Sequence, residues 1–157
     1  MPTVQVRDAT AADAEAVADV VNRAFLVERF FVDGDRTNPA EISGLLEKGT
    51  FLLAEAEERL VACVFVELRG ERGYFGMLSV DPSRQGEGLG RLLVDAAEDR
   101  CRSRGCQVME IHVVDVREEL PPFYRRLGYV EAGEEPFTEH ERTRIPARFI
   151  VMTKPLG

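Results

Sequence analysis

The sequence predicts an α/β protein built on one central sheet that is mostly antiparallel. Strand-like apolar stretches separated by polar turns fill the middle of the chain, at residues 51–80. Segments with helical apolar spacing precede this block and follow it. One of those helices separates the block from the next strand, and a helical crossover of this kind makes two neighbouring strands parallel.

The N-terminal segment is predicted as a strand followed by a helix. Residues 4–7 alternate between apolar and polar side chains, which is typical of a strand. Thr10, with Asp13 three residues later, has the spacing of a helix N-cap, and apolar residues recur at helical spacing from Val17 to Phe25. We therefore expect an amphipathic helix that ends near Phe25.

A second, short helix is predicted over residues 40–48. Asn38 is a typical N-cap residue, and Pro39 suits the first position of a helix. Gly49 is expected to end the helix. The polar residues 33–37 before it are predicted to form a loop.

Residues 51–80 are predicted to form an antiparallel meander of three strands, because each apolar stretch is followed by a short polar turn. The strands are expected at residues 51–55, 60–68 and 74–80, with turns at residues 57–59 and 69–72. Asp81 and Pro82 stop the third strand.

The second half of the chain is predicted to add two helices and three strands. A glycine-rich turn at residues 85–90 leads into a helix whose apolar face runs from Leu89 to Cys101 and which Gly105 caps. The strand at residues 107–113 is expected to lie parallel to the last strand of the meander. The remaining predicted elements are a helix at residues 121–127 and closing strands at residues 129–132 and 149–152.

Composition predicts a single cytoplasmic domain covering residues 1–157, because 45% hydrophobic residues in a chain of this length can build one core. No apolar run approaches the roughly 18 residues of a membrane span, and residues 1–7 lack the features of a targeting signal. The net charge of −8 disfavours a nucleic-acid partner. Three cysteines without a C-x-x-C pair predict reduced thiols, two of them buried, and no metal site.

The turn at residues 85–90 carries the strongest functional signal. Its glycines allow the backbone to approach a ligand closely, and the helix start behind it presents unpaired N–H groups and a positive dipole end. A phosphate group is the favoured ligand, with Arg84 and Arg91 beside it. The turn lacks the Gly-Lys-Ser/Thr ending of a triphosphate loop, and it comes too late in the chain for a dinucleotide fold.

Two ordered motifs make the chain resemble the GCN5-related N-acetyltransferases (GNAT family). Gln85, Gly88 and Gly90 occupy the places of the family signature, which is Gln or Arg, any two residues, Gly, any residue, then Gly or Ala. Downstream, residues 123–129 look like a second family segment, and the resemblance is best over residues 51–130. It implies the family fold, a twisted sheet with helices on both faces and splayed fourth and fifth strands.

The resemblance also implies an acyltransferase that uses acetyl-CoA. The cofactor's pyrophosphate is expected on the backbone amides of the turn, and its pantetheine arm beside the third strand of the meander, where the strands splay. Asp115 stands near the place where many members have an asparagine that contacts the pantetheine arm. The predicted cofactor-binding residues are Leu78, Ser79, Val80, Arg84, Gln85, Gly86, Glu87, Gly88, Leu89, Gly90, Arg91, Asp115 and Phe123.

Tyr124 is predicted to give a proton to the departing thiolate, because family members place the tyrosine of this motif beside the cofactor sulfur. The general base is left open. Glu110 and His112 share one face of a strand and are candidates for it, as Glu67 is more weakly, while a solvated position near the splayed end is the alternative for the pair. A proton relay through water, which the family often uses, needs none of these residues.

The predicted reaction is transfer of the acetyl group to a primary amine of a small molecule, by direct attack in a ternary complex. Two alternatives are open: acetylation of a protein N-terminus or lysine, and a module that binds acyl-CoA without turnover. The acceptor is expected between residues 30–38 and 134–146, whose acidic residues can attract a cationic amine. These include Asp33, Asp35, Glu139 and Glu141. The sequence leaves open whether the chain forms a homodimer, and it predicts no membrane partner.

Overall fold

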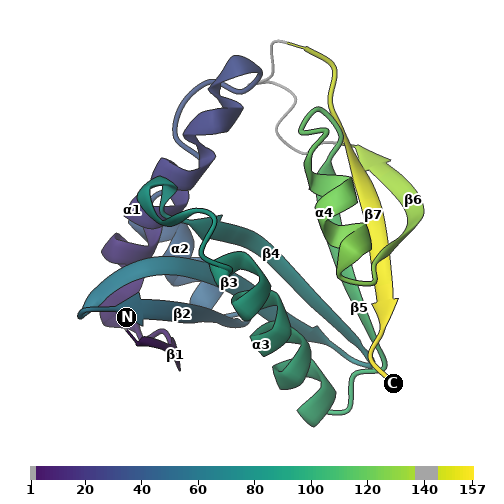
Figure 1. Cartoon of the computed structure of the whole chain (residues 1–157), viewed down its shortest axis with the longest axis horizontal. Helices are drawn as coiled ribbons and strands as arrows, with labels where there is room; N and C mark the ends of the chain where they lie inside the picture. Colours follow the sequence, from purple (N-terminus) through teal and green to yellow (C-terminus); the bar gives the residue numbers. More distant parts are fainter. Residues whose placement is uncertain (1–2, 137–144) are drawn as a thin grey trace.

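The computed structural model describes residues 3–136 and 145–157, which form one seven-stranded mixed sheet with helices on both faces (Figure 1). The strands are β1 (Val4–Asp8), β2 (Thr50–Ala56), β3 (Arg59–Arg69), β4 (Arg72–Val80), β5 (Val108–Val114), β6 (Val130–Pro136) and β7 (Arg148–Pro155). The α-helices are α1 (Ala14–Ala24), α2 (Pro39–Leu46), α3 (Leu89–Ser103) and α4 (Leu120–Arg126). Short 3-10 helices are η1 (Ala11–Asp13), η2 (Phe25–Phe30) and η3 (Pro82–Arg84).

The strand order is β1-β2-β3-β4-β5-β7-β6, and only the β4–β5 pair is parallel. The predicted meander is confirmed as β2, β3 and β4, and the predicted parallel crossover is confirmed as α3. The closing strands lie in reverse sequence order, because β7 inserts between β5 and β6. The sequence gives no signal for this insertion, since both strands have similar local patterns.

Strands β4 and β5 separate soon after they begin. They pair only at Arg72–Tyr74 and Val108–Glu110, whereas β5 stays paired with β7 along its whole length. Figure 1 shows the two strands diverging from the end of the sheet near the C-terminus. The predicted splay of the fourth and fifth strands is therefore confirmed, and it divides the sheet into two arms.

A β-bulge distorts β4 opposite the splay. The register between β3 and β4 shifts between Cys63 and Phe65, and Met77 has a φ of 54° in the middle of the strand. Residues with a side chain rarely adopt this conformation, and a bulge re-aims the backbone next to it. The sequence prediction of a regular strand at residues 74–80 missed this feature.

Two apolar clusters hold the helices on opposite faces of the sheet. Leu93 and Ala97 of α3 pack with Tyr124 of α4 on one face, whereas Val17 of α1 and Ile42 of α2 pack on the other. The strands between them are buried on both sides. This arrangement leaves the N-terminal end of α3 and the N-terminal half of α4 facing each other across the splay.

The three cysteines, Cys63, Cys101 and Cys106, are all free and buried, one more than the two expected. Burial raises the pKa of Cys63 and of Cys101 to about 12, so both stay protonated as thiols. This agrees with the prediction of reduced, unreactive side chains.

The predicted helix caps are present. Thr10 and Asp13 form a capping box, which starts a turn of 3-10 helix before α1. The Oδ1 atom of Asn38 accepts the Glu41 N–H at 2.8 Å and caps α2, which ends two residues earlier than expected.

A buried polar network joins α3 to the opposite arm of the sheet. The Tyr129 hydroxyl donates to Glu98 Oε2 at 2.7 Å, and Lys154 Nζ lies 2.9 Å from Glu98 Oε1. Glu98 is buried, but its charge is paired and its lone pairs are used, as buried charges require. The network therefore fixes α3 relative to β7 and to the end of α4.

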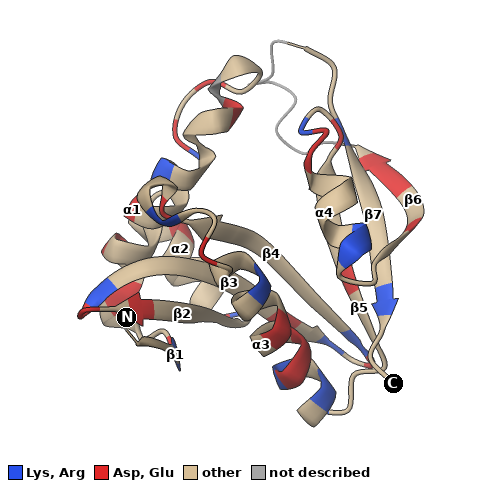
Figure 2. Cartoon of the chain, viewed as in Figure 1, with Lys and Arg blue, Asp and Glu red and all other residues tan. Residues whose placement is uncertain are grey.

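Charged groups are spread over the molecule. Figure 2 shows acidic side chains on several elements, including α3 and β6, with basic side chains among them. Among the described residues, no group of three or more His, Cys, Asp or Glu side chains is arranged to hold a metal ion. No helix in the described parts of the chain is long and apolar enough to span a membrane.

Candidate active site

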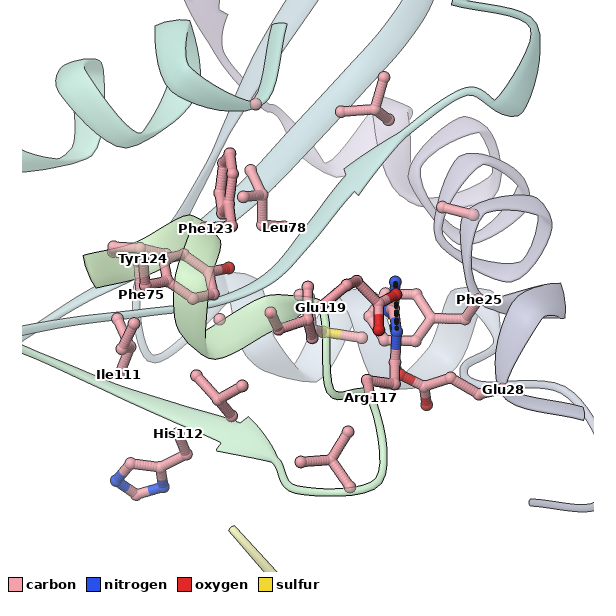
Figure 3. Close-up of a pocket in the computed structure, with 18 of the residues that line it drawn as sticks. Phe25, Glu28, Phe75, Leu78, Ile111, His112, Arg117, Glu119, Phe123 and Tyr124 are labelled. Atoms are coloured by element: carbon pink, nitrogen blue, oxygen red, sulfur yellow. Dashed lines mark hydrogen bonds and ion pairs between the residues drawn. The ribbon is translucent and has the colours of Figure 1, made fainter. Parts of the chain in front are cut away.

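A cavity of about 660 Å³ lies at the splay between β4 and β5. Its walls come from β4, the turn at residues 85–91, β5, α4 and η2 (Figure 3). The cavity therefore lies between the glycine-rich turn after β4 on one arm of the sheet and β5 with α4 on the other, and it extends to η2.

The glycine-rich turn presents free backbone amides to this cavity. Gly86 and Gly88 have φ values of 85° and 79°, and a Cβ at either position would meet no atom within 4 Å. Gly88 is the N-cap of α3, and the first helical hydrogen bond runs from Leu92 N–H to Gly88 C=O. The N–H groups at the first three positions of the helix have no intrahelical partner, so they are available to an anion.

Arg84 adds a guanidinium to the same end of the cavity. Its Nε atom is buried and, among the described residues, has no hydrogen-bond partner, although Glu87 Oε1 lies 3.4 Å away. A buried polar group without a partner is costly. A ligand with negative charge at this turn would supply the missing acceptor, so the residues present fit a phosphate-bearing molecule.

An apolar passage leads from the turn toward the splay. A Cβ at Gly90 would lie 3.6 Å from the Phe123 ring and 3.9 Å from the Leu78 side chain, which is van der Waals contact, so these three residues line the passage together. Figure 3 shows Phe123 and Leu78 side by side on the cavity wall. A narrow, apolar passage of this kind suits an extended, flexible chain.

Tyr124 stands at the inner end of the passage. Its ring is buried among Phe75, Phe123 and Tyr129, with ring centroids 5.0 to 6.1 Å apart. Its hydroxyl points toward the middle of the cavity (Figure 3) and makes no hydrogen bond within the described residues. Burial raises the pKa of Tyr124 above its usual range, so the hydroxyl is a protonated donor at neutral pH.

His112 reaches the cavity from the opposite face of β5. Its Nε2 atom lies 2.8 Å from Glu110 Oε2, and its Nδ1 atom lies 3.7 Å from Glu135 Oε2. An ionised carboxylate can only accept, so a proton on Nε2 completes this hydrogen bond. The Tyr74 ring contacts His112 edge-on, at 5.5 Å between centroids. This arrangement holds an imidazole base in a fixed orientation.

Side chains close the far end of the cavity by joining the two arms. Glu28 of η2 forms an ion pair with Arg117, which follows β5, at 3.2 Å. Beside it, Phe31 and Val32 pack against Val114 at the end of β5, and all three are buried. The contacts bridge segments far apart in the sequence at this end of the cavity.

Most of the predicted cofactor-binding residues line the cavity. These are Leu78, Val80, Arg84, Gln85, Gly86, Gly88, Leu89, Gly90, Arg91 and Phe123. Three do not line it. Ser79 is buried and donates to Met77 C=O at 2.8 Å, Glu87 is exposed, and Asp115 Oδ1 accepts the Arg148 N–H at 3.0 Å. Asp115 thus holds the start of β7, which gives its carboxylate a partner away from the cavity.

Of the candidate bases, His112 lines the cavity and Glu110 does not. Glu110 is hydrogen-bonded to His112 and also pairs with Arg72 at 2.9 Å. Glu67 pairs with Arg69 at 2.8 Å and does not line the cavity. Of the acidic residues expected near the acceptor, Asp33 and Asp35 are exposed and outside the lining, and Glu139 and Glu141 lie outside the described residues.

Several cavity residues were not predicted from the sequence. In sequence, Phe25 and Glu28 lie at or just after the end of a predicted amphipathic helix, and Tyr74 lies at the start of a predicted strand, so neither position indicates a site. Arg36 and Arg117 lie in polar loops, where arginines are common. Only the fold brings these residues to one site. For Arg117 alone, its position seven residues before Tyr124 indicates that it lies near the predicted site.

Comparison with known proteins finds a matching family model and similar folds. A family model described as the acetyltransferase (GNAT) family matches residues 16–129. The ribosomal-protein-S18-alanine N-acetyltransferase from Escherichia coli has a similar fold, with a TM-score of 0.80 and 18% identity, covering 99% of this chain and 95% of that chain. Ard1 from Thermoplasma volcanium gives a TM-score of 0.80 at 16% identity, covering 97% of each chain.

A third similar structure is yncA from Salmonella typhimurium, solved with its cofactor acetyl-CoA. Its TM-score is 0.77 at 18% identity, with 98% of this chain and 94% of that chain covered. At this identity the likeness establishes the shared fold, whereas the family model, over residues 16–129, establishes the family.

Proposed function

The chain belongs to the GNAT acetyltransferase family, whose donor is acetyl-CoA, and we propose that it acetylates the primary amine of a small molecule by direct attack in a ternary complex. The observation that carries the small-molecule acceptor is the closed far end of the cavity. The Glu28–Arg117 ion pair and the cluster of Phe31, Val32 and Val114 join the two arms there. A bulky protein segment would have to break these contacts to enter.

The donor would be held by the turn and the apolar passage. The amides at the start of α3 and the Arg84 guanidinium suit the diphosphate of acetyl-CoA, because the amides have no intrahelical partner and Arg84 Nε has no hydrogen-bond partner among the described residues. Leu78, Gly90 and Phe123 would flank the pantetheine arm. When bound there, acetyl-CoA supplies an activated thioester to the splay.

Tyr124 and His112 suit the two proton transfers of the reaction, because they approach the splay from opposite faces of β5 (Figure 3). His112 Nδ1 would take the proton from the acceptor nitrogen as the new N–C bond forms. Tyr124 would give its hydroxyl proton to the sulfur as the C–S bond breaks. Afterwards His112 loses the extra proton to solvent and Tyr124 regains one, so both residues return to their starting state.

Glu110 would act as a positioning residue for His112. Its carboxylate fixes the tautomer that leaves Nδ1 free, and Glu135 stands close to Nδ1, where it can stabilise the proton taken up. Arg72 holds Glu110 from the other side. The base is thereby oriented by a chain of charge-assisted contacts.

We expect His112→Gln to lower kcat by about 100-fold or more, because a general base typically contributes that factor. Glu110→Gln should lower kcat less, by about 10-fold, since the imidazole remains and only its tautomer is released. The dissociation constant for acetyl-CoA, measured by calorimetry, should stay unchanged in both. If His112→Gln keeps the wild-type kcat and pH profile, a water relay without His112 replaces this assignment.

The experiment that tests the function is CoA release from acetyl-CoA across a panel of small amines, with the acetylated product identified by mass spectrometry. We expect turnover with at least one small amine and none with unrelated peptides at the same concentration. Binding of acetyl-CoA without turnover of any acceptor would contradict the proposal and favour the non-catalytic module.

A protein acceptor is the second candidate, and one observation favours it. Leu26, Val27 and Phe30 of η2 are about half exposed, with exposed fractions of 52%, 50% and 54%. They stand on the side of η2 away from the cavity-lining Phe25 and Glu28. Contiguous exposed apolar side chains can contact a protein. Peptides with a free N-terminal amine therefore belong in the acceptor panel.

A further inference from the structure

Arg36 lines the acceptor end of the cavity, and no hydrogen bond joins its guanidinium to another of the described residues. Its guanidinium carbon lies 5.6 Å from the centroid of the Phe25 ring, which is a cation–π distance. Its one ion-pair neighbour among the described residues is Glu41, at 3.8 Å. The same Glu41 Oε1 atom already accepts the Thr37 hydroxyl at 2.6 Å. The Phe25 ring thus positions the Arg36 guanidinium, and its N–H groups donate no hydrogen bond to the other described residues.

Arg117 lies on the same ring, but its guanidinium is paired with two carboxylates. Its guanidinium carbon is 6.0 Å from the Phe25 centroid, and its nitrogens lie 3.2 Å from Glu28 and 3.1 Å from Glu119. The donors of Arg117 are therefore used in ion pairs within the protein. Of the two guanidiniums on Phe25, Arg36 is the one whose donors remain open to a ligand.

The position of Arg36 is on the acceptor side of the splay. Burial raises the pKa of Tyr74, and the positive charges of Arg69 and Arg36 act against this rise, so Arg36 lies within electrostatic reach of the Tyr74 hydroxyl. Tyr74 in turn contacts His112, the proposed base. A ligand with its amine at His112 can extend past Tyr74 toward Arg36.

The charge of the surroundings favours a monoanion. Glu28 and Glu119 lie around Arg117 at this end of the cavity, and their negative charges oppose a dianionic group such as a phosphate ester. A planar carboxylate carries one charge and matches the guanidinium fork with two parallel hydrogen bonds.

We propose that Arg36 binds a carboxylate of the acceptor, so that the substrate is an amino acid or a similar small molecule with both an amine and a carboxylate. The inference rests on the proposed function and names the substrate class of that site. Of the charged residues in loop 30–38, Arg36 lines the cavity, whereas Asp33 and Asp35, which were expected near the acceptor, do not.

The test uses matched acceptors that differ only at the carboxylate: amino acids of several lengths between amine and carboxylate, their carboxamides, and the amines without either group. CoA release gives kcat/KM for each. For the best chain length, we expect wild type to prefer the acid over its carboxamide by roughly 10- to 100-fold, which is the range for one charge-assisted contact pair.

Arg36→Met should abolish this preference, bringing the acid and carboxamide within about 3-fold, while the KM for acetyl-CoA stays unchanged. Arg36→Lys should keep part of the preference, because it keeps the charge and loses the fork. Arg104→Met is the matched control. Arg104 is exposed at the far end of α3, so its removal should leave the preference intact.

Two results would overturn the inference. One is a wild-type enzyme that uses carboxamides or simple amines as well as the acids. The other is an Arg36→Met variant that loses activity equally with every acceptor. Turnover of no acceptor at all, with acetyl-CoA still bound, is a different pattern, which contradicts the proposed function itself and this inference with it.

Discussion

Replacing Tyr124 by phenylalanine should lower kcat by about 100- to 1,000-fold, because it removes the proposed acid while keeping the ring. The dissociation constant for acetyl-CoA should stay within about 3-fold, since the ring packing with Phe75 and Phe123 is retained. Burial raises the pKa of Tyr124, so its hydroxyl stays protonated across neutral pH, and the wild-type rate should not fall from its ionisation below about pH 10. Steady-state kinetics and calorimetry measure both quantities.

Tyr129→Phe provides the matched control for this substitution. Tyr129 is buried in the same aromatic cluster, but its hydroxyl donates to Glu98 rather than pointing into the cavity. It should reduce the free energy of unfolding by about 1.5 to 3 kcal/mol, the cost of one hydrogen bond to a charged group, and leave kcat unchanged below the melting temperature. A Tyr124→Phe enzyme with full kcat would remove Tyr124 from the mechanism.

Gly88→Val should weaken acetyl-CoA binding by about 10- to 100-fold, which corresponds to losing one or two charge-assisted hydrogen bonds. Gly88 has a φ of 79°, in the left-handed region, and it caps α3 next to the free amides. A β-branched side chain is disfavoured in this conformation, so the turn must shift and the amides change direction. Calorimetric titration with acetyl-CoA measures the effect.

Gly105→Val carries the same backbone strain at the other end of the helix. Gly105 has a φ of 87°, and a Cβ there would meet no atom within 4 Å. It lies after the C-terminal end of α3, outside the cavity lining. We expect a similar loss of stability in both variants and a loss of acetyl-CoA affinity only in Gly88→Val. Equal affinities would mean that the turn does not hold the donor.

Much of the fold was predictable because its signals are local. The meander follows from three apolar stretches separated by polar turns, and the parallel β4–β5 pair follows from the helix between those strands. The caps at Thr10 and Asn38 are short-range hydrogen bonds, and they occur where the sequence predicts them. The glycines at residues 86 and 88 adopt the positive φ that their residue type permits.

The rest of the site depends on long-range geometry that no local pattern encodes. Glu28 and Arg117 are separated by 89 residues and meet only because the sheet splays. Met77 adopts a left-handed conformation without being a glycine, since the register shift against β3 requires it. Asp115 was assigned to the cofactor by its position in sequence, but its carboxylate caps the start of β7.

The central claim is that the backbone amides from residue 86 to residue 91 hold the diphosphate of acetyl-CoA. The most direct measurement is a titration of the protein with acetyl-CoA, followed in its assigned backbone amide NMR spectrum. The account predicts the largest shifts at the Gly86, Gly88 and Gly90 amides, which report hydrogen bonds formed to the ligand. Saturable binding that leaves these three signals in place and moves others would contradict it.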